Sequence, residues 1–197
     1  QKAAERAGHF ILEHMVQGGR LFRRSRLGQT AIPAFQDDYA CLALGFLDLY
    51  ETTFDLFWLE KAQWLLEEMT RLFWDGEPKN GGFFYTAEDA EPLVIRPKEY
   101  YDGAVPSGNS VALVVLMRFY RMSGDSRWLN YAQKLISSHA AQASNHPAAF
   151  PFFLAGVDWT AGPVQEIVLA GEKESPEFKN FWKILKEQFN PLQVVLH

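Results

Sequence analysis

The stretch Ala40-Cys-Leu-Ala-Leu-Gly-Phe-Leu47 is apolar almost all round, and so is Val111-Ala-Leu-Val-Val-Leu-Met117. A helix without a polar face must be buried on every side, so both stretches are predicted to be inner helices. Each is followed by a segment with one apolar stripe at helical spacing, which begins at Trp58 in the first case and at Trp128 in the second. These segments are predicted to be outer helices with one face in water.

The alternation of buried and amphipathic segments repeats at a fixed offset. Residues of the first pair recur 70 positions later, and self-similarity of this kind indicates a repeated helical hairpin. An opening helix over 2–17 and a third hairpin that begins around Pro147 to Asp158 bring the expected number of main helices to six. The sequence therefore predicts an all-α fold, a partial (α/α)6 toroid in which an outer ring of helices seals an inner ring. The matched residues are Tyr50, Asp55, Trp58, Leu59, Ala62, Gln63 and Leu65, with Tyr120, Asp125, Trp128, Leu129, Ala132, Gln133 and Leu135.

The character of the chain changes after Gly162-Pro163. Residues 166–170 and 193–196 have the composition of strands, and they bracket an amphipathic helix over 176–189. We expect a small βαβ segment over 163–197, appended to a toroid domain over 1–162.

Composition excludes several classes of function. The net charge of −5 and the single cationic cluster over 20–26, interpreted as a solvated loop, argue against nucleic acid as a partner. No apolar stretch is long enough to predict a membrane span. Cys41 is the single cysteine, which excludes an internal disulfide and a cysteine-rich metal site and predicts a reducing compartment, the cytoplasm. No metal-binding motif is present, and we expect neither a metal nor a cofactor.

The middle of the chain carries a family resemblance. The residues that carry it are Gly81-Gly-Phe-Phe-Tyr-Thr86, Glu88-Asp89, Arg96, Lys98-Glu99 and Asp102-Gly-Ala-Val-Pro-Ser-Gly-Asn-Ser110, with Asp37-Asp38-Tyr39-Ala40 further upstream. This pattern resembles the C-terminal half of the YyaL-type family, which includes spermatogenesis-associated thioredoxin-domain proteins. The resemblance implies a toroid similar to those of N-acylglucosamine 2-epimerases and six-hairpin glycosidases. It also implies a thioredoxin-like domain upstream, absent from these residues, as expected for a chain that begins inside a helix.

The loops that enter the inner helices hold the candidate catalytic residues. In a toroid these loops converge on one mouth of the cavity, and they contain Asp37 and Asp38 before the first inner helix and Asp102 before the second. Two carboxylates that face each other across a pocket suit acid/base or glycosidic chemistry. The alternative for Asp38 is an N-cap, but the two neighbouring aspartates cannot both cap the helix.

Five further residues are candidates for substrate binding. Ser107 and Asn109 belong to a glycine-punctuated loop that enters a helix, and the alternative for Ser107 is a helix cap. Trp74 and Tyr85 offer aromatic faces for a sugar ring, although packing in the core is an equal alternative. Arg96 either contacts the ligand or belongs to an ion-paired loop.

The leading functional hypothesis is a central pocket for a small carbohydrate, in a relative of sugar isomerases, epimerases or glycoside hydrolases. Epimerases of the similar fold use histidines as proton carriers, and His146 is the only one of the five histidines expected near a mouth, which weighs against that activity. The alternative is a scaffold that docks the thioredoxin-like domain or a client protein. We expect Asp102 and one of Asp37 and Asp38 to line the largest pocket, with a raised carboxyl pKa unless a cation reaches the pair. Inner helices without neighbours should also expose apolar surface and make the chain self-associate.

Overall fold

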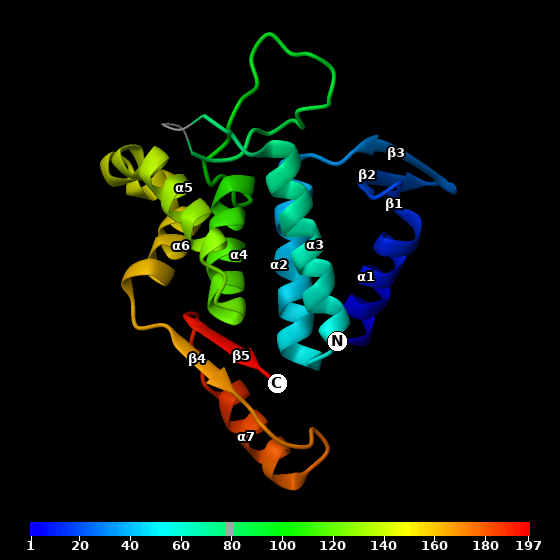
Figure 1. Cartoon of the computed structure of the whole chain (residues 1–197), viewed down its shortest axis with the longest axis vertical. Helices are drawn as coiled ribbons and strands as arrows, with labels where there is room; N and C mark the ends of the chain where they lie inside the picture. The colour runs from blue at the N-terminus through cyan, green and yellow to red at the C-terminus, as the bar shows by residue number, and fades with distance from the viewer. Residues whose placement is uncertain (78–80) are drawn as a thin grey trace.

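The computed structural model describes residues 1–77 and 81–197, and within them the chain is mainly helical (Figure 1). The first part of the chain alternates helices with one small sheet, and the C-terminal part forms a second sheet. The helices are α1 (Lys2–His14), α2 (Gln36–Thr53), α3 (Leu56–Phe73), α4 (Gly108–Ser123), α5 (Ser126–Asn145), α6 (Pro151–Ala161) and α7 (Pro176–Glu187), with a 3-10 turn η1 (Pro147–Ala149). The strands are β1 (Val16–Gln17), β2 (Arg20–Arg26), β3 (Gln29–Pro33), β4 (Gln165–Val168) and β5 (Gln193–Leu196).

The two helices predicted to be inner differ in how far they are buried. In α4, every residue from Gly108 to Phe119 is buried, as predicted. In α2 the prediction is wrong along one strip, because Cys41, Gly45 and Asp48 are exposed at i, i+4 and i+7. The apolar composition of α2 does not reveal that strip, since small residues tolerate both environments.

Each inner helix forms a hairpin with the outer helix that follows it. α2 packs against α3 and α4, and α4 packs against α5 and α6, so the predicted helical hairpins are present. Glycines set the closest approaches between the inner helices. A Cβ on Gly108 would lie 1.9 Å from the Oε1 atom of Gln36, and one on Gly156 would lie 2.8 Å from the Leu113 side chain. The structure does not extend to a closed ring, so the toroid stays a prediction.

The turns between paired helices confirm the sequence repeat. Asp55 caps α3 by accepting the N–H of Phe57 at 3.0 Å, and Asp125 caps α5 by accepting the N–H of Arg127 at 2.9 Å. The preceding residues, Phe54 and Gly124, are both left-handed, with φ of 55° and 69°. Phe54 holds this conformation without being glycine because its ring is buried against α7.

The cationic segment 20–26 is a strand, so its interpretation as a solvated loop is wrong. It forms β2, which pairs antiparallel with β1 and β3. Burial along the strand does not alternate regularly: Leu21 faces the core, while the arginine side chains can reach water or a partner. Arg20, for example, forms a two-fold contact with Asp89 at 2.8 and 3.0 Å. The opening helix consequently ends at His14 instead of 17.

The βαβ segment after residue 162 is present as predicted. Strands β4 and β5 are parallel, and α7 connects them. The segment packs onto the first part of the chain, because Val194 joins the main core and Phe178 and Val195 form a second apolar cluster with Phe54.

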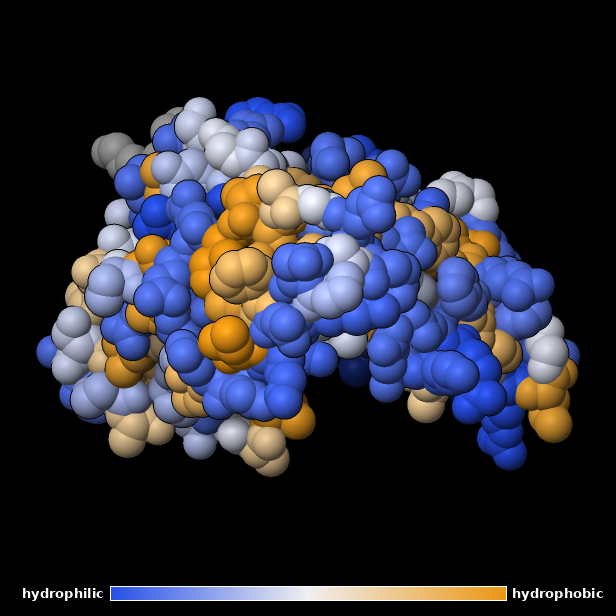
Figure 2. Space-filling view, turned by 90° about the horizontal axis from the view of Figure 1, so that it is seen from below, coloured by the Kyte–Doolittle hydropathy of each residue, from blue (hydrophilic) through white to orange (hydrophobic). Residues whose placement is uncertain are grey.

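The outer surface of the C-terminal segment carries exposed apolar side chains. The segment lies at the lower end of the molecule in Figure 1, and Figure 2 shows the molecule from that end. An apolar patch occupies part of this face, beside a hollow in the arched outline. The exposed residues of the segment include Val168, Phe181, Ile184 and Phe189. None of the helices within 1–77 and 81–197 has the length and apolar character to cross a membrane.

Candidate functional site

The N-terminal ends of α2, α4 and α6 meet at one end of the molecule, which we call the rim together with the loops that enter these helices. The Nε2 atom of Gln36, at the start of α2, donates to the carbonyl oxygen of Gly108, at the start of α4, at 3.0 Å. The carboxylate of Asp102 accepts N–H groups from the start of α6. The loops that enter these helices therefore lie at the same end of the molecule.

Asp102 lies at the rim, where backbone groups surround it. One carboxylate oxygen accepts the N–H of Ser107 at 2.8 Å, and the other accepts those of Phe152 at 2.8 Å and Phe153 at 3.0 Å. The residue is only 7% exposed. One of its oxygens lies at the N-terminal end of α6, where backbone N–H groups have no partner within the helix. This geometry is that of a structural anion that joins α4 and α6.

Ser107 and Asn109 are also held by backbone contacts. Ser107 is the N-cap of α4, and its hydroxyl accepts the N–H of Ser110 at 3.2 Å. Asn109 is 1% exposed; its Oδ1 accepts the N–H of Phe83, and its Nδ2 donates to the carbonyl oxygens of Phe83 and Glu99. Both side chains thus have partners that fix the loop before α4.

Asp37, Asp38 and Tyr85 come together around Arg23 of strand β2. Arg23 on β2 lies 3.5 Å from Asp37 and 3.7 Å from Asp38, and it donates to the Tyr85 hydroxyl at 3.0 Å. The Tyr85 ring stacks on Phe35, with centroids 4.8 Å apart. We call Arg23, Asp37, Asp38 and Tyr85 the Arg23 cluster.

The two carboxylates of the Arg23 cluster have different surroundings. The Asp38 carboxylate accepts the N–H of Phe35 at 2.9 Å from the third position of α2, so it satisfies the helix start without being the N-cap residue. Burial raises the pKa of Asp38, and the Phe35 N–H and Arg23 oppose that rise. The Oδ1 atom of Asp37 is buried and makes no hydrogen bond. Asp37 therefore retains an acceptor that a ligand could use.

Trp74 and Arg96 lie away from this cluster. The indole of Trp74 packs edge-on against Phe83 and Tyr131, a core arrangement. Arg96 donates to the carbonyl oxygen of Thr86 at 2.7 Å, and its guanidinium lies 4.2 Å from the Phe84 ring centroid. Both contacts stabilise the long segment between α3 and α4.

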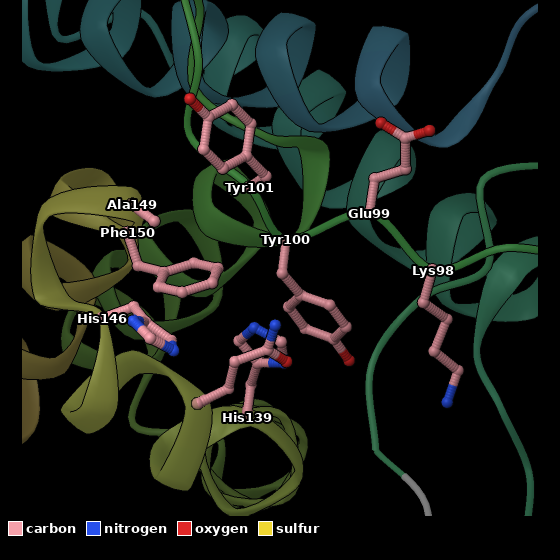
Figure 3. A pocket seen from close by; sticks show the side chains of 9 residues that line it. Lys98, Glu99, Tyr100, Tyr101, His139, His146, Ala149 and Phe150 are labelled. Carbon is pink, nitrogen blue, oxygen red and sulfur yellow. The ribbon is translucent and has the colours of Figure 1, made fainter.

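The three aspartates share none of the described cavities. Asp37 and Asp38 line a cavity of about 400 Å³ together with Arg23 and Cys41, whereas Asp102 does not. The largest of the described cavities, about 590 Å³, lies between α5 and the loop before α4 (Figure 3). Its walls include Tyr100, His139 and His146, so the expectation that the aspartates line the largest pocket is wrong. The reason is that Asp102 turns inward to the starts of α4 and α6.

Other chemistry at the rim is restricted. The residue is exposed as a whole, but neighbouring side chains partly desolvate the Cys41 thiol, and this desolvation and then the two nearby carboxylates raise its pKa, which disfavours the nucleophilic thiolate. Within residues 1–77 and 81–197, no three His, Cys, Asp or Glu side chains are grouped so that they could hold a metal ion.

The fold and rim define a class: a mainly helical protein of paired helices, followed by a βαβ segment. The chain is 31% identical to mouse spermatogenesis-associated protein 20 over 198 residues, which is 95% of this chain and 25% of that protein. The human protein of that name is 29% identical over 98% of this chain and 26% of its own length. An uncharacterized protein of Caenorhabditis elegans is also 29% identical over 98% of this chain.

These similarities support the spermatogenesis-associated protein 20 family. The chain spans about a quarter of the length of the relatives it matches. No profile of a known protein family matches the chain.

Proposed function

We propose that the rim binds a small carbohydrate at the Arg23 cluster. The observation that carries the proposal is the convergence of Asp37 and Asp38 on Arg23 in a cavity of about 400 Å³. A guanidinium and carboxylates are the donors and acceptors that sugar hydroxyls need. The cavity volume falls within the usual range for small-molecule sites.

The same residues are suited to acid/base chemistry. Because burial raises the pKa of Asp38, a larger fraction of its carboxyl is protonated near neutral pH than for an exposed aspartate. Asp37 supplies the second carboxylate, with one oxygen unpartnered. Enzymes that act on glycosidic bonds use two neighbouring carboxyl groups in different environments, one as the acid and the other as the base. The proposed activity is that of a sugar isomerase, epimerase or glycoside hydrolase relative.

Saturation-transfer NMR with a panel of monosaccharides and disaccharides tests this proposal. We expect signals from at least one sugar with the parent protein, and their loss in Asp37→Asn and Arg23→Gln. Glu60→Gln is the matched control, because Glu60 is an exposed carboxylate on the outer helix α3. Binding that survives both cluster variants, or no binding by any sugar, would reject the site.

A second candidate function, docking of a thioredoxin-like domain or client protein, is favoured by a different observation. The segment between α3 and α4 exposes Val94, Ile95 and Val105, and Figure 1 shows this segment projecting beyond the rim end of the helices. Exposed apolar side chains on one loop are typical of a contact surface. The occupant proposed here is the thioredoxin-like domain that the family resemblance implies.

Isothermal titration of the chain with a separately expressed thioredoxin-like domain from a longer relative tests the docking. We expect a complex that Val94→Ser with Ile95→Ser weakens. An unchanged affinity in that double variant would exclude this loop as the docking surface.

A further inference from the structure

The largest described cavity belongs to neither proposed function. It lies between the last turns of α5, the turn η1 and the loop 98–101, and its volume of about 590 Å³ suits one small molecule. Figure 3 shows Phe150 and His146 on one side of the Tyr100–His139 pair and Lys98 on the other. None of the residues of the Arg23 cluster lines it.

Aromatic rings in fixed positions form the inner wall. Tyr100 and His139 stack with centroids 3.8 Å apart and planes 7° apart, and Phe150 meets His139 edge-on at 4.9 Å. The Tyr100 hydroxyl lies 3.2 Å from both the Gly81 carbonyl oxygen and the Ser138 hydroxyl, which anchors the pair. The side chains of this wall therefore need little rearrangement when a ligand binds, which reduces the conformational entropy lost on binding.

His139 supplies the buried polar group of that wall. It is 8% exposed, and burial lowers its pKa, which favours the neutral imidazole. Its Nε2 atom is buried and has no hydrogen-bond partner. An unsatisfied buried polar atom is costly, and a ligand that bonded to it would remove that cost.

Lys98, the one lysine or arginine in the described lining of the cavity, is already engaged. The Lys98 ammonium donates to Asp75 at 2.6 Å and to the Gly81 carbonyl oxygen at 2.8 Å. The cavity therefore offers an anion no uncommitted lysine, and the neutral imidazole does not attract one. Glu99, Gln142 and His146 are exposed residues of the lining, so their polar groups remain accessible to water.

We propose that the cavity beside Tyr100 and His139 binds an uncharged flat heteroaromatic ring, with a ring nitrogen or N–H hydrogen-bonded to Nε2 of His139. Ring faces and edges of the wall favour a flat aromatic partner. A sugar, by contrast, would need several buried polar partners, and the wall supplies one. This site is separate from the sugar site proposed at the Arg23 cluster.

Benzimidazole at pH 7.5, where it is uncharged, is the probe we would use. Long-range ¹H–¹⁵N NMR spectra resolve the imidazole rings, and we expect benzimidazole to shift the His139 signals and leave those of His9 and His14 unchanged. His139→Phe keeps a ring beside Tyr100 but removes the nitrogen, and its affinity should be roughly tenfold weaker. Ala149→Phe should block binding by filling the cavity, since Ala149 lines it. Asp37→Asn should bind the probe as the parent does.

The proposal is overturned if benzimidazole leaves the His139 signals unchanged, or if His139→Phe binds it with the parent affinity. If His139→Phe fails to fold, Ala149→Phe decides: unchanged binding in that variant rejects the cavity. Displacement of benzimidazole by methyl glucoside at equal concentration would reject the heteroaromatic class. Sugar binding at the Arg23 cluster is measured separately, so failure of one site does not imply failure of the other.

Discussion

Replacing Asp102 by asparagine should destabilise the protein strongly, although asparagine is normally a good substitute for a capping aspartate. Both carboxylate oxygens accept backbone N–H groups, one from Ser107 and the other from Phe152 and Phe153. An asparagine has only one acceptor oxygen. Whichever way its amide is turned, the NH₂ group must face at least one backbone N–H.

The magnitude follows from the number of lost bonds. A hydrogen bond to a charged group contributes about 1.5–3 kcal/mol, so losing one or two of them should lower the free energy of unfolding by about 1.5–6 kcal/mol. For a domain of this size the melting temperature should fall by roughly 3–24 °C.

Urea and thermal unfolding monitored by circular dichroism measure this difference. Asp37→Asn is the matched control, because Asp37 has a 3.5 Å contact with Arg23 and should lose less than about 1 kcal/mol. A parental melting temperature in Asp102→Asn would refute the structural role of this carboxylate. Loss of sugar binding without any loss of stability would instead favour the catalytic hypothesis for Asp102.

Four further predictions concern packing, titration and association. Gly108→Ala should lower the free energy of unfolding by about 1–3 kcal/mol, because the new Cβ would lie 1.9 Å from a side-chain oxygen of α2, whereas Gly45→Ala, with open space around it, should be neutral or stabilising. Chemical denaturation measures both variants, and equal effects would contradict the packing of α2 on α4. Burial lowers the pKa of His139, so its contribution to stability is present when the pH is above 6.5, the ordinary pKa of histidine, and is lost as the pH falls below that value. Melting curves of His139→Phe should lack this loss, and a pH profile equal to that of the parent would show that His139 is not its source. Burial raises the pKa of Glu51, so its contribution to stability declines as the pH rises above 4.5, the ordinary pKa of glutamate. Glu51→Gln can still accept the N–H of Val195, and its free energy of unfolding in urea should decline less with pH; the same pH dependence as in the parent would show that Glu51 does not cause the decline. Light scattering should show association that grows with concentration, because apolar side chains are exposed; a monomer at every concentration would contradict this.

The helical framework could be predicted from the sequence because it depends on local periodicity. The apolar runs of α2 and α4, the stripes of α3 and α5 and the repeated turns at Asp55 and Asp125 each mark an element within a few turns of chain. The antiparallel sheet β1–β3 was missed because β2 has four arginines in seven residues and no regular alternation, and Leu21 is the one buried residue of that strand.

The candidate site could be predicted only in part. Sequence spacing identified Asp37 and Asp38, but Arg23, the residue that joins them to Tyr85, lies on the strand that was missed. The inward turn of Asp102 depends on the start of α6, a distant contact that no local pattern reveals. The cavity beside His139 likewise forms between segments far apart in the chain.

A crystal structure of the protein soaked with the sugar that gives the strongest NMR signal tests the central claim most directly. Sugar density beside Arg23, with a hydroxyl within hydrogen-bond distance of Oδ1 of Asp37, is the predicted result. Density for the sugar only at some other surface, with the cavity of the Arg23 cluster unchanged, would contradict the claim that the rim is a carbohydrate site.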